Sequence, residues 1–112
     1  MVDDDEVSAL AARTILKGMG YQVDVAPNGA AAVELFSTES YAMVLMDWQM
    51  PVMDGLEATA RMRRMLRGRI TPIVGTTTQM SLAECLRTGM DDLMPKPFTE
   101  ENMKSTVNKW IR

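Results

Sequence analysis

Residues 44–55 read Val44-Leu45-Met46-Asp47-Trp48-Gln49-Met50-Pro51-Val52-Met53-Asp54-Gly55. An apolar run ends in the carboxylate of Asp47, and turn-forming residues follow at once. A continuous apolar run of this kind is typical of a strand that is covered on both faces, as in parallel sheets. The stretch therefore predicts a buried strand that presents Asp47 at the rim of a sheet, where open parallel sheets bind their ligands.

Strand-like and helix-like segments alternate along the rest of the chain. Strands are predicted at 21–26, 42–46, 72–76 and 93–94, and helices at 6–19, 30–37, 56–66, 81–88 and from Thr99 onward. Only Met1 and Val2 precede the first aspartate, so the first strand is truncated, and we expect this to reflect a boundary of the sequence. The βαβαβαβαβα order predicts one α/β domain over 1–112, with a parallel sheet covered by helices on both faces.

The composition fits a small globular domain and excludes several kinds of site. Apolar residues make up 46% of the 112 residues, and the net charge of −3 gives no argument for nucleic-acid binding. The chain has no histidine, so it supplies no histidine catalyst or metal ligand. Its single cysteine excludes an internal disulfide and favours a reducing, cytoplasmic compartment. No apolar run approaches the 18 residues typical of a membrane span.

Two further features of the composition have ordinary interpretations. The 12 methionines are interpreted as core residues of adaptable shape rather than as a binding groove. A basic stretch along the third predicted helix and the residues that follow it is interpreted as a solvated helix face rather than a nucleic-acid patch. It contains Arg61, Arg63, Arg64, Arg67 and Arg69.

The predicted strand ends carry side chains that suit phosphoryl transfer, namely Asp3, Asp4, Asp47, Thr77 and Lys96. Clustered carboxylates favour a hard cation such as Mg²⁺, because the cation offsets their repulsion. An ionised carboxylate can attack a phosphoryl group without a base, and a hydroxyl and an ammonium can contact the phosphoryl oxygens. Each residue also has a simpler interpretation: helix cap, turn cap, strand residue or solvated lysine. Their order and placement favour one phosphoryl-transfer site.

The chain resembles the receiver domain of two-component response regulators over essentially its whole length. The resemblance rests on Val2-Asp3-Asp4-Asp5-Glu6-Val7, on residues 45–55 quoted above, on Pro72-Ile73-Val74-Gly75-Thr76-Thr77, and on Gly89-Met90-Asp91-Asp92 leading into Lys96-Pro97-Phe98. The sequence of residues 46–55 and 89–92 is most similar to that of receivers in hybrid sensor histidine kinases. The resemblance implies a flavodoxin-like, doubly wound, five-stranded parallel sheet with the strand order 2-1-3-4-5.

The resemblance also implies a role for each acidic residue in a phosphorelay. Asp47 is the implied phosphoacceptor, and Mg²⁺ is held by Asp3, Asp4, Asp47 and the backbone carbonyl of Gln49. The implied donor is a phosphohistidine on a histidine kinase or a histidine phosphotransfer domain, docked on the first helix and its neighbouring loops. No contact with nucleic acid or membrane is expected from this domain, and no turnover beyond self-phosphorylation and autodephosphorylation.

The implied switch combines a hydroxyl and a lysine. Thr77 is the first choice for the hydroxyl and Thr78 the second, and Lys96 is the implied active-site lysine. The family usually places an aromatic residue three positions before this lysine, where the chain has Leu93, so an aromatic readout is not expected. The 12 positions from Thr77 to Gly89 are shorter than the family's usual interval by about one helical turn, so the helix between them should be short.

Two alternative functions stay open at this point. One is a pseudo-receiver that binds a partner without being phosphorylated. The other is a phosphatase of the haloacid-dehalogenase type, which also uses an aspartate nucleophile on a parallel sheet. That phosphatase needs a second acid two residues after its nucleophile, and Gln49 occupies this position.

Overall fold

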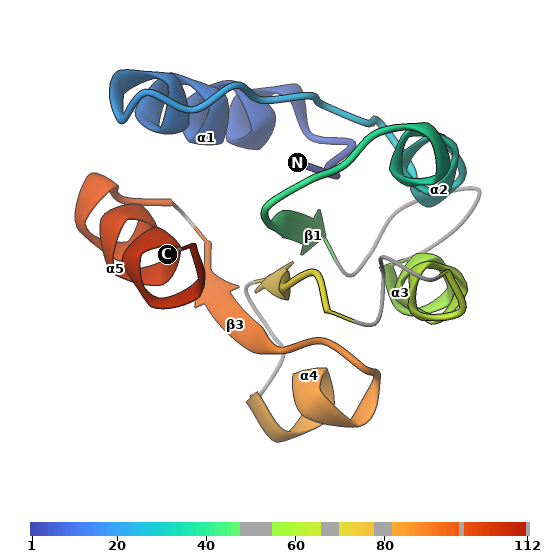
Figure 1. The fold of residues 1–112 in the computed structure, drawn as a ribbon. Coiled ribbons are helices and arrows are strands. Elements are labelled where there is room, and N and C mark those ends of the chain that lie inside the picture. Colours follow the sequence, from blue (N-terminus) through green and yellow to red (C-terminus); the bar gives the residue numbers. More distant parts are fainter. Residues whose placement is uncertain (48–54, 66–69, 78–81, 97, 112) are drawn as a thin grey trace.

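The chain folds as a central parallel sheet between two layers of helices in the computed structural model (Figure 1). The structure describes residues 1–47, 55–65, 70–77, 82–96 and 98–111. Its elements are α1 (Glu6–Gly18), α2 (Gly29–Thr38), β1 (Val44–Asp47), α3 (Gly55–Arg63), β2 (Ile73–Thr77), α4 (Leu82–Arg87), β3 (Asp92–Pro95) and α5 (Glu100–Trp110). Figure 1 shows α1 and α5 on one side of the strands and α2 and α3 on the other. The predicted α/β class is confirmed.

The three strands pair in the order β1-β2-β3, all parallel. Asp47, the last residue of β1, is level with Thr76 in β2, and Thr76 is level with Met94 in β3. Successive side chains along a strand point to opposite faces, so this register decides which residues can meet at the carboxyl end of the sheet.

Residues 1–3 occupy the place of a first strand between Ala26 and β1. The Val2 amide donates to the Leu45 carbonyl (2.7 Å), and the Val2 carbonyl accepts from the Asp47 amide (2.9 Å). On the other side, the Asp3 amide donates to the Ala26 carbonyl (3.0 Å). Val2 thus bridges Ala26 and Met46 in parallel. This arrangement agrees with the predicted order 2-1-3-4-5.

The prediction of a strand over residues 21–26 is wrong for most of its length. Only Ala26 forms a bridge, and residues 21–25 have no strand assignment. A strand exists only where a neighbour offers ladder partners. Within residues 21–26, residues 1–3 form a ladder bridge with Ala26 alone, and the bond from the Met1 amino group to the Asp24 carbonyl does not extend it. The alternating apolar pattern of residues 21–26 is visible in the sequence, whereas only the structure shows which of these residues have a ladder partner.

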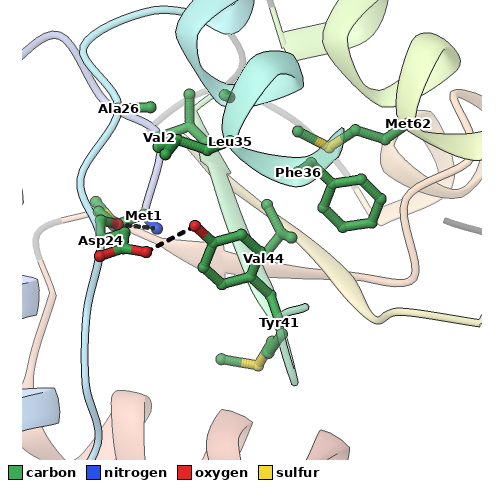
Figure 2. Close-up of a pocket in the computed structure, with 11 residues that line it drawn as sticks. Met1, Val2, Asp24, Ala26, Leu35, Phe36, Tyr41, Val44 and Met62 are labelled. Carbon is green, nitrogen blue, oxygen red and sulfur yellow. Dashed lines mark hydrogen bonds between the residues drawn. The ribbon is translucent and has the colours of Figure 1, made fainter. Parts of the chain in front are cut away.

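A small cavity of about 30 Å³ lies beside this short first strand, toward the amino-terminal end of β1 (Figure 2). The Tyr41 hydroxyl donates to Asp24 Oδ2 (2.7 Å), and the Met1 amino group donates to the Asp24 carbonyl (3.0 Å). Burial, together with the Asp24 carboxylate that accepts this hydrogen bond, raises the pKa of Tyr41 to about 12. The cavity is otherwise lined mainly by apolar side chains and is separate from the acidic residues described below.

Two apolar clusters fill the space on the two faces of the sheet. Val44, Met46 and Ile73 pack toward α2 and α3, whereas Leu45 and Val74 pack toward α1 and α5. The alternation along β1 follows from the two-residue period of a strand. The interpretation of methionines as core residues is confirmed for a group of them that is buried: Met46, Met62, Met90, Met94 and Met103.

Residues at the helix ends account for where these helices begin and end. Thr99 Oγ1 accepts from the Asn102 amide (3.1 Å) and caps α5, the helix predicted from Thr99 onward. Gly89, at φ +96°, follows α4, where glycine is favoured because it lacks a Cβ. Asp5 caps α1 by accepting from the Val7 amide (3.0 Å). A hydrogen bond from Ser8 and this one from Val7 hold the pKa of Asp5 below its ordinary value.

The basic stretch contains one arginine that is not part of a solvated face. Arg61 is exposed and pairs with Glu57 one turn earlier (3.1 Å), as that interpretation requires. Arg63 instead points inward: its guanidinium donates to the Gly89 carbonyl (2.8 Å), the Thr71 carbonyl (2.8 Å) and Asp91 Oδ2 (2.7 Å). The solvated-face interpretation is therefore wrong for Arg63. Arg64 is exposed, and Arg67 and Arg69 lie outside the described residues.

Asp92, the first residue of β3, holds α5 against the sheet. Its Oδ2 accepts from the Trp110 indole (2.8 Å) and lies 3.3 Å from Lys109 Nζ, and its Oδ1 accepts from the Leu93 amide (2.8 Å). Burial opposes ionisation of this carboxyl, but the hydrogen bonds outweigh burial and leave the pKa below its ordinary value. The adjacent Asp91 and Asp92 thus fix β3 from both faces, one through α3 and one through α5.

Replacing Arg63 with lysine tests whether its three inward hydrogen bonds (the inward anchor) stabilise the fold. A lysine ammonium cannot reproduce the planar guanidinium that donates to three acceptors at once, so we expect the free energy of unfolding to fall by about 2 kcal/mol. Arg61→Lys, in an exposed pair on the same helix, should change it by less than about 0.5 kcal/mol. Urea unfolding of both variants measures the difference. Equal effects would contradict the inward anchor.

Candidate functional site

Three of the predicted site residues meet at the carboxyl end of the sheet. Asp47 ends β1, Asp3 follows the Val2 bridge, and Lys96 follows β3 directly. Lys96 Nζ lies 2.8 Å from Asp3 Oδ2 and 3.5 Å from Asp47 Oδ2. The expectation that the strand ends bring these side chains together is confirmed.

The two carboxylates are buried, and one ammonium serves both. Asp3 is 3% exposed and Asp47 is 6% exposed. Burial disfavours the charge on Lys96, but the ion pairs with Asp3 and then Asp47 outweigh it and raise the pKa of the lysine above its ordinary value. Lys96 is therefore a cation at neutral pH. Its side chain is only 15% exposed, so the interpretation as a solvated loop lysine is wrong.

The acidic run at residues 3–5 divides into three different environments. Asp3 is buried, with its Oδ1 accepting from the Asp5 amide (2.9 Å). Asp4 is exposed, and Asp5 caps α1. The two interpretations of this run, helix cap and cation ligand, therefore apply to different members of it. The Asp5 amide also fixes the Asp3 carboxylate in orientation, so the start of α1 is tied to the site.

The carboxylates are arranged to hold a cation. Asp3, Asp4 and Asp47 each place an oxygen within 4.8 Å of the others. Oxygen donors of this kind suit a hard divalent ion such as Mg²⁺. Three carboxylates against the single ammonium of Lys96 leave an excess of negative charge, which a divalent ion would offset. Gln49, the fourth predicted ligand, lies outside the described residues.

The residues assigned to the switch are described only in part. Thr77 ends β2, at the same edge of the sheet as Asp47, and its side chain is not described. Thr78 lies outside the described residues. Leu93 is half-buried and packs with the cluster on the α2 and α3 side. Helix α4 has 6 residues, which confirms the short helix predicted after Thr77.

One polar residue near the site received no role from the sequence. Thr76 is fully buried and level with Asp47 in the ladder between β1 and β2. Its hydroxyl has no hydrogen-bond partner among the described residues. In the sequence Thr76 is one of three successive threonines, and only the register of β2 against β1 distinguishes it.

The chemistry open to this arrangement follows from its charges. Asp47 presents a carboxylate at the rim of the sheet, and Lys96 provides a positive charge beside it. An ionised carboxylate can act as a nucleophile without a base. A phosphoryl group attached there would lie next to an ammonium and a potential cation site, which are the groups that stabilise charge in phosphoryl transfer.

Comparisons with known proteins agree with this chemistry. The family model described as the response regulator receiver domain matches residues 1–108. The chain is 37% identical to the sensor histidine kinase GacS of Pseudomonas protegens, covering 97% of this chain and 12% of that protein. It is 34% identical to the aerobic respiration control sensor protein ArcB of Escherichia coli K12, covering 98% and 14%. It is also 42% identical to the two-component response regulator ORR41 of rice, covering 98% and 91%.

Solved structures show the same fold. The receiver domain of a sensor histidine kinase from Pseudomonas aeruginosa, with a magnesium ion coordinated in its active site cleft, superposes with a TM-score of 0.90 at 32% identity, over 97% of this chain and 92% of that one. The chemotaxis protein CheY4 of Vibrio cholerae gives 0.92 at 26% identity, over 98% and 94%. In the described part of the chain, no helix has the length and apolar character needed to cross a membrane.

Removing the Lys96 charge tests the electrostatics of the cluster. Lys96→Met leaves two buried carboxylates without their ammonium, so we expect the free energy of unfolding in EDTA to fall by roughly 2–3 kcal/mol. Millimolar Mg²⁺ should restore more stability to this variant than to the wild type. The matched control, Lys104→Met on the exposed side of α5, should show the wild-type response to Mg²⁺. If Lys96→Met has the same free energy of unfolding as the wild type both in EDTA and in Mg²⁺, the ammonium does not stabilise the two carboxylates.

Proposed function

Because this chain belongs to the response regulator receiver family of two-component phosphorelay systems, we propose that Asp47 is its phosphoacceptor. The donor is a phosphohistidine on a histidine kinase or a histidine phosphotransfer domain. The proposal is supported chiefly by one observation: buried Asp47 lies at the end of β1, 3.5 Å from the ammonium of Lys96 and close to two further carboxylates. The chain spans 12% and 14% of the two sensor kinases above, so their activities are not assigned to it.

The transfer step needs no base in this chain. A carboxylate oxygen of Asp47 attacks the phosphorus of the donor, and the bond between phosphorus and the imidazole nitrogen breaks. The bonding electron pair stays on that nitrogen, which is left as a neutral imidazole once proton exchange with solvent is complete. The product is an acyl phosphate on Asp47. Proximity of Lys96 to Asp47 supplies positive charge where the phosphoryl oxygens arrive.

The carboxylates of Asp3, Asp4 and Asp47 and the carbonyl of Gln49 are the proposed ligands of Mg²⁺. The bound ion would neutralise charge on the phosphoryl oxygens during transfer. The three described carboxylates meet the geometric requirement, because their oxygens approach one another within 4.8 Å. The magnesium ion in the active site cleft of the Pseudomonas aeruginosa receiver supports the same choice of metal.

Phosphorylation adds a charge of about −1.5 to −2 at Asp47 together with three acceptor oxygens. Contacts to this group favour a rearranged state of the loops that follow β1 and β2, with the Thr77 hydroxyl drawn toward it. The change is a shift between two populations rather than a new fold. Leu93 occupies the position of the family's aromatic residue, so the readout runs through the loops and backbone instead of a rotating ring.

The alternatives are not favoured. A pseudo-receiver has no need of a buried acceptor carboxylate, a lysine paired with it and a cation-binding acidic group together, and here all three are present in one cluster. The haloacid-dehalogenase type of phosphatase needs an acid at position 49, where this chain has glutamine.

Intact-mass analysis after incubation with acetyl phosphate and Mg²⁺ tests the acceptor. The wild type should gain one phosphoryl group, Asp47→Asn should gain none, and EDTA should suppress the adduct. Asp24→Asn, a carboxylate on the far side of the first-strand residues, is the matched control and should be labelled like the wild type. No adduct on the wild type, or an undiminished adduct on Asp47→Asn, would contradict the proposal that Asp47 is the phosphoacceptor.

We further propose that the donor docks on the first turns of α1. Val7 and Leu10 are large apolar side chains that are 76% and 66% exposed. They lie at the end of α1 whose cap, Asp5, also orients Asp3 of the site. A donor must bring its phosphohistidine to Asp47, so its contact surface has to include the rim of the site, and α1 starts three residues after Asp3 of that site.

Leu10→Glu tests this docking surface. The rate of transfer from a purified kinase that phosphorylates the wild type should fall about tenfold, as expected for the loss of an apolar contact at an interface. Labelling by acetyl phosphate should stay unchanged, because the acceptor is intact. The matched control is Ile70→Glu, which alters a side chain that is 86% exposed just before β2. If both variants slow transfer equally, α1 is not the docking surface.

A further inference from the structure

Asp91, the residue just before β3, holds both backbone groups of Ile73, the first residue of β2. The Asp91 amide donates to the Ile73 carbonyl (2.7 Å), and Asp91 Oδ2 accepts from the Ile73 amide (2.9 Å). In a regular parallel ladder, the amide and the carbonyl of one residue pair with two different residues of the neighbouring strand. Here a single residue serves both, because its carboxylate takes the place of a backbone carbonyl.

Arg63 of α3 fixes the same junction from outside the sheet. Its Nη2 donates to the Asp91 oxygen that also accepts from Ile73 (2.7 Å). Its other two hydrogen bonds go to the carbonyls of Thr71 and Gly89 (2.8 Å each), in the segments that lead into β2 and β3 respectively. Because the guanidinium is planar and rigid, these contacts fix the starts of the two strands relative to each other.

The packing of β3 itself specifies its register only weakly. β3 has 4 residues, and Met94 is the buried one among them. Register is strongly specified where a whole strand face is buried, because a slip would then expose that face. The bonds made by Asp91 and Arg63 therefore supply a constraint that the side chains of β3 supply only in part.

The register of β3 decides where the Lys96 ammonium lies. Lys96 follows β3 directly, and its Nζ lies 2.8 Å from Asp3 Oδ2 and 3.5 Å from Asp47 Oδ2. A slip of β3 by one residue along β2 would move its backbone by about 3.3 Å. That displacement is as large as the ion-pair distances themselves, so it would separate the ammonium from its carboxylates.

We propose that Arg63 and Asp91 are positioning residues for phosphoryl transfer: they set the register of β3 against β2 and thereby place the Lys96 ammonium beside Asp47. This inference rests on the proposed function of Asp47. Both residues act through Lys96, at the opposite end of β3, rather than by contact with the phosphoryl group.

Two adjacent acids separate this role from general destabilisation. Asp91→Ala removes the carboxylate that holds Ile73, whereas the matched control Asp92→Ala removes the carboxylate that bonds Trp110 of α5. Asp91→Asn is a milder variant, available should the alanine fold poorly. It keeps a side-chain oxygen that can accept from the Ile73 amide and loses only the charge beside Arg63.

The first readout is the rate of phosphorylation by acetyl phosphate at saturating Mg²⁺, followed by intact mass at a temperature where every variant is folded. Asp91→Ala should be labelled about tenfold more slowly than the wild type, the factor for one charge-assisted contact in the transition state. Asp91→Asn should recover part of this loss. Asp92→Ala should stay within about twofold of the wild type, a difference below that of one hydrogen bond.

The second readout is the shift that Lys96→Met causes in the urea midpoint in EDTA, which requires no phosphorylation. In the Asp91→Ala background this shift should be less than about half of that in the wild type, because both changes break the same contact. In the Asp92→Ala background the shift should equal that in the wild type. A merely structural role of Asp91 would make its effect and that of Lys96→Met additive.

Equal phosphorylation rates in Asp91→Ala and Asp92→Ala would overturn the inference while leaving Asp47 as the acceptor. An undiminished effect of Lys96→Met in the Asp91→Ala background would overturn it as well. If the wild type takes up no phosphoryl group, the proposed function fails and the role in transfer fails with it, whereas the urea midpoints still report whether Asp91 positions Lys96.

Discussion

The ion pairs of one ammonium, Lys96, with two buried carboxylates, Asp3 and Asp47, are the interaction on which the rest of the structure depends. Two carboxylates removed from water at the end of a sheet repel each other, and each loses its hydration. The ammonium offsets both effects only if three separate segments of the chain bring their side chains to one place. The parallel register of β1, β2 and β3 and the bridge made by Val2 achieve this.

The remainder of the fold holds these three segments in position. β3, which leads into Lys96, is fixed at its start by Asp91 on one face and Asp92 on the other, through Arg63 and Trp110 respectively. At the opposite end of the cluster, the Asp5 amide orients Asp3 while the Asp5 carboxylate caps α1. The same cluster retains an excess of negative charge, so it remains receptive to a divalent cation. A phosphoryl group arriving at Asp47 would compete for the ammonium that now joins Asp3 and Asp47, which couples the chemistry to the arrangement of the strand ends.

Sequence patterns predicted the parts of this structure that depend on local signals. The position of Asp47 at a strand end, the Thr99 cap and the glycine after α4 each follow from a few adjacent residues. The predictions that were wrong concern pairing between distant segments. Residues 21–25 have the pattern of a strand without a ladder partner, and Arg63 belongs to a charged run whose inward member is decided by Thr71, Gly89 and Asp91. The neighbourhood of Thr76 and Asp47 likewise needs the register of two strands. The roles of Gln49 and of the Thr77 hydroxyl remain predictions.

The central claim is that the carboxylate at the shared ammonium, and no other acid of the cluster, carries the phosphoryl group. Borohydride reduction of the phosphorylated protein tests it most directly, because it converts an acyl phosphate on aspartate to homoserine, which peptide mass analysis can locate. We expect homoserine at position 47 in the sample treated with acetyl phosphate and Mg²⁺, and none in the untreated protein. Homoserine at position 3 or 4, or its absence from a protein that has gained a phosphoryl group, would contradict the account.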